Sequence, residues 1–395
     1  MLIKNKKLLN DLISELSKVV GERKSELFEL NKRITLDTDY WILKDYKMIK
    51  SYLKNYIKNY YSIEPMSIKP KGKILIILSY NEPFILSIIP ILNALITGND
   101  VILKPSRETK NFIKIIWQKS GLLKKYGLKL KIISPNIYDE IEDVIRNVRA
   151  VYFFGSYKIA KNIAKLCGRY YVEFYPEIET SDVKIFNKTL SDNIKTDALL
   201  TIRESFTHSG QSCQRIQGIF VHKDLYDNYV KILQQEFMEM CNSKRLDKFI
   251  DHSYIFSRKK LFKSLYLDIV KSKPEKIIKT NDLPILVIKP KTNSEFTRNA
   301  YFLPVLWIEP FSCAKELIKT LNSRKFFLGV NIQSNDAEFI NEIINNTKFT
   351  RHTINTSHIN IRLIEGWGGS WPSGFCGYKS WLEHFSDSYV VINKS

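Results

Sequence analysis

The chain has 395 residues, 44% of them hydrophobic and 26% charged, which excludes a disordered, collagen-like or coiled-coil protein and suits two globular domains. Its net charge is +20, but the basic residues stand in pairs and triplets, which favours solvated surfaces over a nucleic-acid partner. No apolar stretch is long enough for a transmembrane helix, and the basic N-terminus lacks a secretory apolar run, so we expect a cytoplasmic protein.

The first part of the chain predicts a helical arm followed by a parallel sheet. Residues 3–30 and 40–62 place apolar side chains at helical spacing. From Lys73 onward, short apolar runs alternate with helical patterns. The runs are 74–78, 101–103, 129–133 and 150–154, and the helical patterns are 84–96, 107–123 and 137–147. This alternation predicts right-handed crossovers and a parallel sheet that is covered on both faces.

After residue 178 the alternation loosens but continues, which predicts a second α/β domain. Its strand-like runs are 216–221, 285–288, 305–308 and 326–332, and its helical patterns are 223–238 and 313–322. A Gly- and Trp-rich tail starts at Gly366 and ends in a strand-like segment, 388–393. We therefore expect an arm and a first domain over 1–178, a second domain over 179–365 and a C-terminal segment over 366–395.

One of the five cysteines differs from the others in its surroundings. The five are Cys167, Cys213, Cys241, Cys313 and Cys376, and no two have the spacing of a zinc or redox motif, so neither a metal site nor a disulfide framework is expected. Cys213 ends the polar segment His208-Ser209-Gly210-Gln211-Ser212, which predicts a flexible, accessible turn. Three others are interpreted as small buried side chains. They are Cys167, on a predicted helix, Cys241, placed just beyond one, and Cys313, near a predicted helix start. Cys213 is the candidate reactive thiol.

Two strand ends carry groups that suit a nucleotide. Lys104-Pro105-Ser106 ends a predicted strand, and open α/β sheets bind ligands at that edge. Gly155-Ser156 joins a strand to a helix, where free amides attract a pyrophosphate. The Gly-x-Gly-x-x-Gly fingerprint of nucleotide binding is absent from the sequence.

Taken together, motifs from residue 70 to the end resemble the aldehyde dehydrogenase superfamily, most closely its short class 3, fatty-aldehyde branch. The matching segments are Pro70-Lys71-Gly72, Tyr80-Asn81-Glu82-Pro83, Ala94-Leu95-Ile96-Thr97-Gly98-Asn99, Lys104-Pro105-Ser106, Phe153-Phe154-Gly155-Ser156, Ser209-Gly210-Gln211-Ser212-Cys213, Phe302-Leu303-Pro304-Val305, Gly368-Gly369 and Ser373-Gly374. The resemblance implies a Rossmann-type parallel-sheet cofactor domain, an α/β catalytic domain and an active site between them.

The resemblance also implies roles for single residues. Cys213 would attack a carbonyl carbon, and Asn81 with the Cys213 amide would hold the oxyanion. The cofactor would be NAD or NADP. Its adenine ribose would lie at Lys104, in the motif that includes Ser106. Its pyrophosphate would lie at Gly155 and Ser156, and its nicotinamide near Phe302.

Three positions depart from the resembled pattern. The family's Glu-Leu-Gly-Gly motif would fall near 173–180, where this chain lacks both glycines. Glu177 fits the position of the general base, and Glu173 is the alternative. These glutamates could also be ordinary surface charges at a strand edge. Ala300 stands where a glutamate would contact the nicotinamide ribose. Arg107 follows Lys104-Pro105-Ser106 where an acid is usual, which favours the 2′-phosphate of NADP.

Three functions follow as alternatives. The first is an NAD(P)-dependent aldehyde dehydrogenase that produces a carboxylic acid. The second is an NADPH-dependent acyl-thioester (acyl-CoA) reductase, which needs no hydrolytic base and suits a basic chain. The third is a catalytically degenerate member. The partner would be a small aldehyde or acyl thioester, and an arm pairing with a partner's sheet would make a homodimer.

Overall fold

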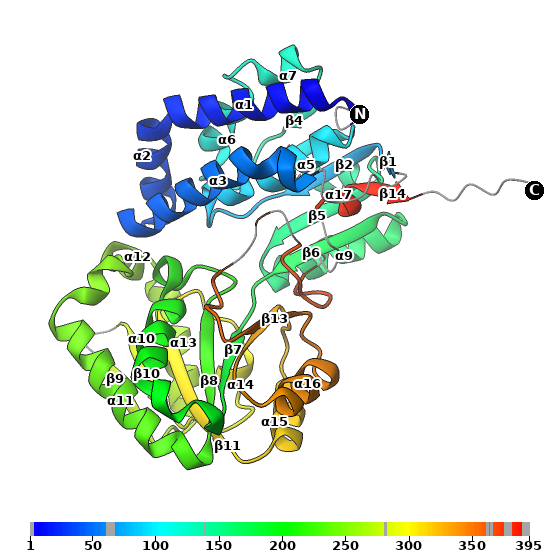
Figure 1. The fold of residues 1–395 in the computed structure, drawn as a ribbon. Coiled ribbons are helices and arrows are strands. Elements are labelled where there is room, and N and C mark those ends of the chain that lie inside the picture. Colours follow the sequence, from blue (N-terminus) through cyan, green and yellow to red (C-terminus); the bar gives the residue numbers. More distant parts are fainter. Residues whose placement is uncertain are drawn as a thin grey trace, which may run out of the picture.

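The protein, seen in a computed structural model, folds into two halves, each built on its own sheet (Figure 1). The structure describes residues 4–60, 68–137, 140–279, 283–360, 363, 366–374 and 381–388. Cys376 and residues 389–393 of the expected last strand lie outside them. Among the described helices, none combines the length and the apolar character needed to cross a membrane.

The helical arm forms three helices that cover the first half. They are α1 (Lys6–Glu22), α2 (Lys24–Thr35) and α3 (Asp39–Tyr60). The expected single helix over 3–30 is two helices, because the backbone leaves the helical region at Arg23. Leu9, Leu12 and Leu16 are fully buried in the core of the first half, so the arm is part of that core. Helix α2 ends at Leu36, which has a left-handed φ of 51°.

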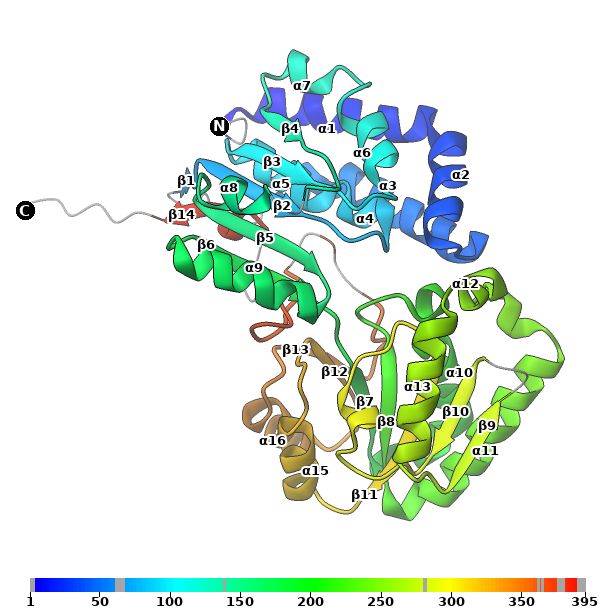
Figure 2. The same ribbon diagram turned by 180° about the vertical axis from the view of Figure 1, so that it is seen from behind.

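The sheet of the first half is parallel, as predicted from the sequence. Its strands, in spatial order, are β4 (Leu130–Ile132), β3 (Asp100–Lys104), β2 (Lys73–Ile77), β5 (Ala150–Gly155) and β6 (Glu173–Ile178). Its further helices are α4 (Pro83–Leu86), α5 (Ile89–Ile96), α6 (Lys110–Trp117), α7 (Leu122–Lys125), α8 (Ile141–Ile145) and α9 (Tyr157–Arg169). Figure 2 shows α9 along the side of this half that faces the second half.

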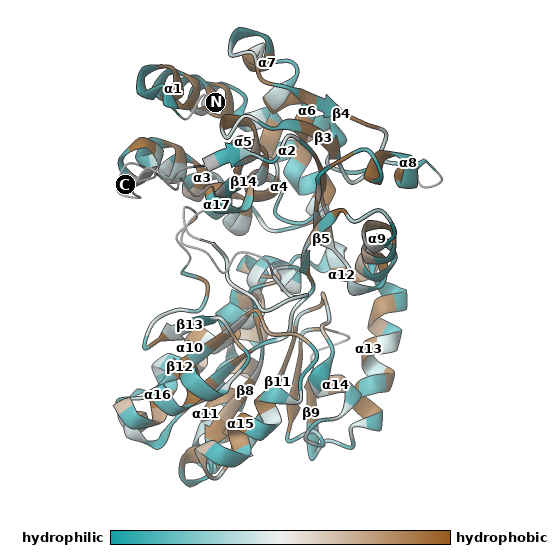
Figure 3. Ribbon diagram, turned by 90° about the vertical axis from the view of Figure 1, so that its right-hand side faces the viewer, coloured by the Kyte–Doolittle hydropathy of each residue, from teal (hydrophilic) through white to brown (hydrophobic). Residues whose placement is uncertain are grey.

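The second half holds a seven-stranded sheet in which only β9 runs antiparallel to its neighbour. In spatial order the strands are β13 (Arg351–Ile354), β12 (Gly329–Gln333), β7 (Asp182–Phe186), β8 (Ile216–His222), β11 (Val305–Phe311), β10 (Ile285–Ile288) and β9 (Lys276–Lys279). The helices are α10 (Ile194–Ser205), α11 (Lys223–Asn242), α12 (His252–Ser257), α13 (Lys259–Lys271), α14 (Glu295–Arg298), α15 (Ala314–Asn322) and α16 (Ala337–Asn346), with short 3₁₀ turns η2 (Lys188–Asn193), η3 (Thr207–Gly210) and η4 (Arg245–Lys248). Figure 3 shows the apolar strands of this sheet between helices with hydrophilic outer faces.

The chain returns to the first half near its end. Helix α17 (Trp381–His384) packs into the core of the arm and first sheet, and β14 (Ser386–Ser388) pairs antiparallel with β1 (Ile68–Pro70). The two main sheets thus occupy 73–178 and 182–354. The domain boundaries proposed from the sequence, at 178 and 365, stay a prediction.

Candidate active site

A cavity of about 280 Å³ lies between the two halves, at the carboxyl ends of β2, β5 and β6. Its lining is Ser79, Tyr80, Asn81, Glu82, Leu86, Phe154, Gly155, Ser156, Glu177, Ile178, Glu179, Cys213, Leu261, Ala300, Phe302 and Trp367. The cavity therefore brings together six of the residues that the sequence singled out. These are Asn81, Gly155, Ser156, Glu177, Cys213 and Phe302.

The loop that carries Cys213 is buried and sharply turned, which differs from the flexible, accessible turn expected from its composition. His208, Ser209 and Gly210 have consecutive φ values of 53°, 56° and 86°, and all three are buried. Gly210 is required here, because a Cβ would approach the Leu303 carbonyl carbon to 2.4 Å. The polar residues of this segment make internal hydrogen bonds instead of facing solvent.

The helical arm holds this loop in place. The Asp37 carboxylate lies 2.6 Å from His208 Nδ1 and accepts a hydrogen bond of 3.1 Å from the Ser209 hydroxyl. The Gln211 side-chain amide donates to the Thr35 carbonyl oxygen at 2.9 Å. Sequence reasoning missed Asp37, since it stands 171 residues from His208 and no local pattern links them.

The environment of Cys213 disfavours its thiolate. Burial raises the pKa of the Cys213 thiol well above its ordinary value, and the carboxylates of Glu82, Glu177 and Asp182 raise it further. Arg351 acts in the opposite direction. The resting thiol therefore keeps its proton at neutral pH, and attack on a substrate requires a base that takes this proton.

Asn81 is oriented by the chain on both sides of its amide. The Ser79 hydroxyl donates to Asn81 Oδ1 at 2.6 Å, and Asn81 Nδ2 donates to the Gln211 carbonyl oxygen at 3.3 Å. These two bonds fix which end of the Asn81 amide faces the loop that carries Cys213. The donating end of Asn81 thus points toward the segment that precedes Cys213.

The two candidate bases lie at opposite ends of β6. Glu177 lies at its carboxyl end, lines the cavity and is 5% exposed, so the interpretation of this residue as a surface charge is wrong. Glu173 lies at the amino end and pairs with Lys71 at 2.7 Å and with Arg149 at 2.9 Å. Glu173 is absent from the cavity lining, so of the two candidates only Glu177 shares the cavity with Cys213. Its role as a base stays a prediction.

The predicted nucleotide-binding residues form two groups. The first group lies at the end of β3 and outside the lining of this cavity: Lys104 is the last residue of the strand, and Ser106 and Arg107 follow it. The Lys104 amine donates to the Pro135 carbonyl oxygen at 2.9 Å. The Ser106 and Thr109 hydroxyls lie 3.0 Å apart. Arg107 donates to Asn136 Oδ1 at 3.3 and 3.2 Å.

Gly155 and Ser156 lie in the cavity at the start of α9, where the Ser156 hydroxyl accepts a hydrogen bond from the Ile159 amide. Strand-end donors and a helix start suit a dinucleotide. Phe302 adds an aromatic ring on the opposite wall, whereas Ala300 offers no side-chain hydrogen bond. The residues present therefore fit a nicotinamide dinucleotide, with one polar contact fewer than the resemblance implies.

Two α/β halves with a thiol, a carboxylate and a helix start in the cavity between them are the architecture of a nucleotide-dependent dehydrogenase. The model of the aldehyde dehydrogenase family matches residues 45–393, so the chain belongs to this family. It is an NAD(P)-dependent aldehyde dehydrogenase, as predicted from the motifs.

The chain is similar to the 4,4'-diaponeurosporen-aldehyde dehydrogenase of Staphylococcus aureus, with 24% identity over 98% of this chain and 86% of that protein. It is 24% identical to a putative succinate-semialdehyde dehydrogenase [NADP(+)] of Mycolicibacterium smegmatis, over 67% of this chain and 53% of that protein. The fold matches a Mycobacterium tuberculosis aldehyde dehydrogenase complexed with NAD+, with a TM-score of 0.81 and 15% identity over 96% of this chain and 84% of that one. The predicted fold class and the use of NAD or NADP are thereby confirmed; the class 3 assignment stays a prediction.

Proposed function

We propose that this enzyme oxidises an aldehyde to a carboxylic acid through a covalent thiohemiacetal and then a thioester on Cys213. The observation that carries the proposal is the shared cavity: Cys213, Asn81 and Glu177 all line one space of about 280 Å³. A thiol, an amide donor and a carboxylate are the groups that nucleophilic attack, oxyanion stabilisation and proton transfer require.

The first chemical step joins Cys213 to the substrate. The Cys213 sulfur forms a bond with the aldehyde carbon while Glu177 takes the thiol proton, because the raised pKa of Cys213 keeps that proton in place at rest. Asn81 Nδ2 and the Cys213 amide donate hydrogen bonds to the resulting oxyanion. Gly155, Ser156 and Phe302 would hold the NAD(P) dinucleotide, which would supply the acceptor for the hydride that leaves the substrate carbon.

The second step releases the product. Once the hydride has left, the carbonyl is re-formed and the substrate is a thioester of Cys213. Glu177, after giving its proton to solvent, takes a proton from a water molecule that attacks this carbonyl. The carbon–sulfur bond then breaks, and Glu177 passes this proton to the Cys213 sulfur, which restores the thiol. The net reaction consumes aldehyde, water and oxidised dinucleotide and yields carboxylic acid, reduced dinucleotide and a proton.

The lining favours an apolar aldehyde. The cavity wall includes the apolar side chains of Leu86, Phe154, Ile178, Leu261 and Trp367. The described lining residues include no Lys, Arg or His. A substrate with its own carboxylate would therefore find no positive partner there, while an alkyl or aryl chain would be desolvated favourably. We expect medium- and long-chain aldehydes to be better substrates than semialdehydes.

NADP is the preferred cofactor in this proposal, on the strength of Arg107. Its guanidinium is exposed and, within the part of the chain that the structure describes, is bonded to the Asn136 side-chain oxygen, so it can turn toward a 2′-phosphate. The similarity to an NADP(+)-linked succinate-semialdehyde dehydrogenase points the same way. Homodimerisation, a cytoplasmic location and the absence of a nucleic-acid partner stay predictions.

One assay tests the proposal and its alternatives. Purified protein receives NAD+ or NADP+ with aldehydes of increasing length, and separately acyl-CoA with NADPH, while absorbance of the reduced nicotinamide is followed. We expect aldehyde-dependent reduction and loss of activity by at least about 10³-fold in Cys213→Ala. Cys313→Ser should leave activity unchanged. Cys313 lies at the N-cap position of α15 and is exposed, so its interpretation as a buried side chain is wrong. If acyl-CoA oxidises NADPH and no aldehyde reduces the dinucleotide, the protein is the reductase. If no substrate reacts, it is the catalytically degenerate member.

A further inference from the structure

Glu179 follows β6 directly and lies in the cavity beside the start of α9. Strands β5 and β6 are parallel with Gly155 opposite Ile178, so the residues that follow them, Ser156 and Glu179, lie side by side where α9 begins. Glu179 lines the cavity of about 280 Å³ and also an adjoining cavity of about 800 Å³, and Leu261 and Ala300 line both as well. Glu179 thus stands between two spaces that share a wall.

The Glu179 carboxylate is bound to the start of α9. The Tyr157 amide donates to Glu179 Oε2 at 2.7 Å, and the Ser156 hydroxyl accepts from the Ile159 amide at 3.5 Å. Amides in the first turn of a helix have no acceptor within the helix and are the donors that an incoming anion uses. Two of them in α9 are already taken by acceptors from the chain itself.

The hydrogen bond between the Tyr157 amide and the ionised Glu179 carboxylate is favourable in the absence of a ligand. A negative charge at a helix N-terminus is favourable, by about 0.3–1 kcal/mol at exposed positions and more where it is partly buried. Burial raises the pKa of Glu179, whereas the Tyr157 amide bond lowers it. A diphosphate is an anion that needs the same donors, and a carboxylate beside it adds repulsion between like charges.

We propose that Glu179 occupies the place of the cofactor's diphosphate, and that a dinucleotide binds only when this carboxylate leaves the Tyr157 amide. Glu179 thereby sets the affinity of the enzyme for its cofactor. With Glu177 as the glutamate of the resembled Glu-Leu-Gly-Gly motif, Glu179 stands at the first glycine, which carries no such charge. The inference rests on the proposed function, since it takes α9 as the diphosphate site.

The test measures binding rather than turnover. Wild type, Glu179→Ala, Glu179→Gln and the control Glu316→Gln, an exposed carboxylate on α15, are titrated with NADP+, NAD+, ADP and nicotinamide riboside. Calorimetry and intrinsic tryptophan fluorescence, to which Trp367 in the cavity lining contributes, report binding. We expect Glu179→Ala to bind both dinucleotides and ADP about ten-fold more tightly, which is about 1.4 kcal/mol, and nicotinamide riboside unchanged. Glu179→Gln keeps an acceptor oxygen without charge and should gain less.

A second measurement needs no ligand. Hydrogen exchange of the Tyr157 amide should accelerate in Glu179→Ala and stay slow in Glu179→Gln, which can still accept its hydrogen bond. Suppose that Glu179→Ala and Glu179→Gln still oxidise aldehydes but bind dinucleotides and ADP no more tightly than wild type. This result would overturn the role of Glu179 and leave the proposed function standing. Absence of dinucleotide binding in all variants, together with absence of aldehyde oxidation, would overturn the proposed function and this inference with it.

Discussion

At the scale of single residues, the Cys213 thiol faces more negative than positive charge. Burial raises its pKa most, the carboxylates of Glu82, Glu177 and Asp182 raise it further, and Arg351 lowers it. Glu82 is well suited to substitution, because glutamine keeps its shape and hydrogen-bonding capacity while the charge is lost. Glu82 is itself largely buried, and burial raises its pKa, so its effect on Cys213 increases as the pH rises and the carboxyl ionises.

Glu82→Gln should make Cys213 more reactive toward iodoacetamide. A neighbouring anion disfavours the thiolate, so removing it lowers the pKa of Cys213 and increases the thiolate fraction at any fixed pH below that pKa. We expect alkylation about two- to five-fold faster at pH 8, which corresponds to about 0.5–1 kcal/mol, and a pH profile displaced to lower pH. Mass spectrometry of the Cys213 peptide between pH 7 and 10 measures this.

The matched control is Glu29→Gln, which removes the same charge from an exposed position on α2. Its profile should coincide with that of wild type. Slower alkylation in Glu82→Gln, or a profile displaced to higher pH, would contradict the electrostatic description of the cavity.

Local sequence patterns could reveal only part of this site. Cys213, Asn81, Gly155 and Ser156 each stand in a short motif, and Glu177 followed from counting between two of them. The residues that hold the Cys213 loop are distant in sequence. Asp37, for example, lies in the segment between α2 and α3 and contacts His208. Lys104, Ser106 and Arg107 were assigned to the cofactor by resemblance, and their roles stay predictions.

At the scale of elements, the nucleophile loop depends on one glycine. Gly210 has a φ of 86°, and a Cβ there would lie 2.4–2.6 Å from the backbone of Leu303 and Pro304. Gly210→Ala should therefore destabilise the protein by about 2–4 kcal/mol, from left-handed strain plus the clash, and should displace Cys213 from the cavity. Urea unfolding and the aldehyde assay at a permissive temperature measure the two effects.

Gly168→Ala serves as the comparison, because it makes the same change in α9 with an ordinary φ and no atom within 4 Å of the added Cβ. We expect it to stabilise the protein by about 0.5–1 kcal/mol without altering activity. Equal stability of the Gly210→Ala protein and wild type would show that the loop is not confined as described.

Hydrophobic runs located most strands, but not every element boundary. The run 84–96, expected as one helix, forms two: α4 ends at Leu86, and α5 begins at Ile89 with Pro90 in its first turn. Strand β6 was missed since its sequence, Glu-Phe-Tyr-Pro-Glu-Ile, is that of an edge strand with polar positions. Helix α11 extends to Asn242, so Cys241 lies in its last turn and not beyond it, as the sequence had suggested. Periodicity cannot detect such ends, which depend on tertiary packing.

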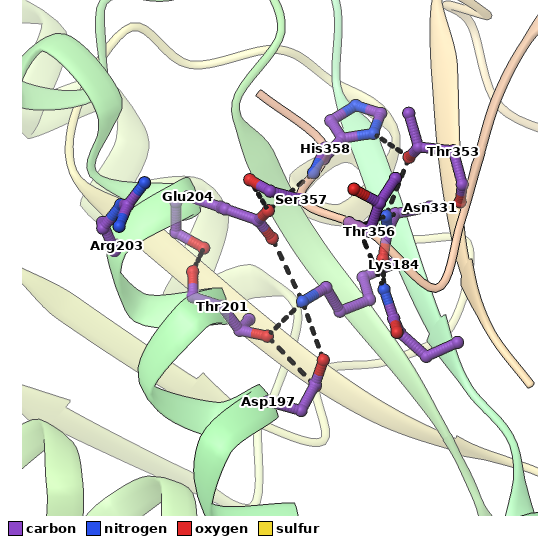
Figure 4. A network of polar contacts seen from close by, with 12 residues as sticks. Lys184, Asp197, Thr201, Arg203, Glu204, Asn331, Thr353, Thr356, Ser357 and His358 are labelled. Atoms are coloured by element: carbon purple, nitrogen blue, oxygen red, sulfur yellow. Dashed lines mark hydrogen bonds and ion pairs between the residues drawn. The ribbon is translucent and has the colours of Figure 1, made fainter. Parts of the chain in front are cut away.

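At the scale of the whole molecule, a buried charge network ties the second half together (Figure 4). Lys184 on β7 is fully buried and lies 3.0 Å from Asp197 and 3.1 Å from Glu204, both on α10. Glu204 also accepts hydrogen bonds from Ser357 and from the His358 amide, which follow β13. The network thus joins a central strand, the helix that leads to the Cys213 loop, and the segment after the last strand of the sheet.

Lys184→Met should cost about 3–5 kcal/mol of unfolding free energy, because it leaves two buried carboxylates without their cation. Burial opposes the charge on Lys184, but Asp197 and Glu204 outweigh it and raise the pKa, so the side chain is charged at neutral pH. Lys129→Met, which breaks an exposed pair with Asp100 at 3.1 Å, should cost at most about 1 kcal/mol. Urea titration compares the two, and a loss in Lys184→Met no larger than in Lys129→Met would contradict a structural role for the network.

The most direct test of the mechanism asks whether a covalent intermediate accumulates on Cys213 when its hydrolysis is blocked. Glu177→Gln is mixed with NADP+ and a long-chain aldehyde, reduced dinucleotide is followed in the first turnover, and the protein is digested for mass spectrometry. In Glu177→Gln the first step depends on the small thiolate fraction of Cys213 and is slow, whereas hydrolysis lacks its base altogether. A thioester should therefore accumulate on the Cys213 peptide, with at most one equivalent of reduced dinucleotide per site. Steady turnover at the wild-type rate, or an adduct on another residue, would contradict the account.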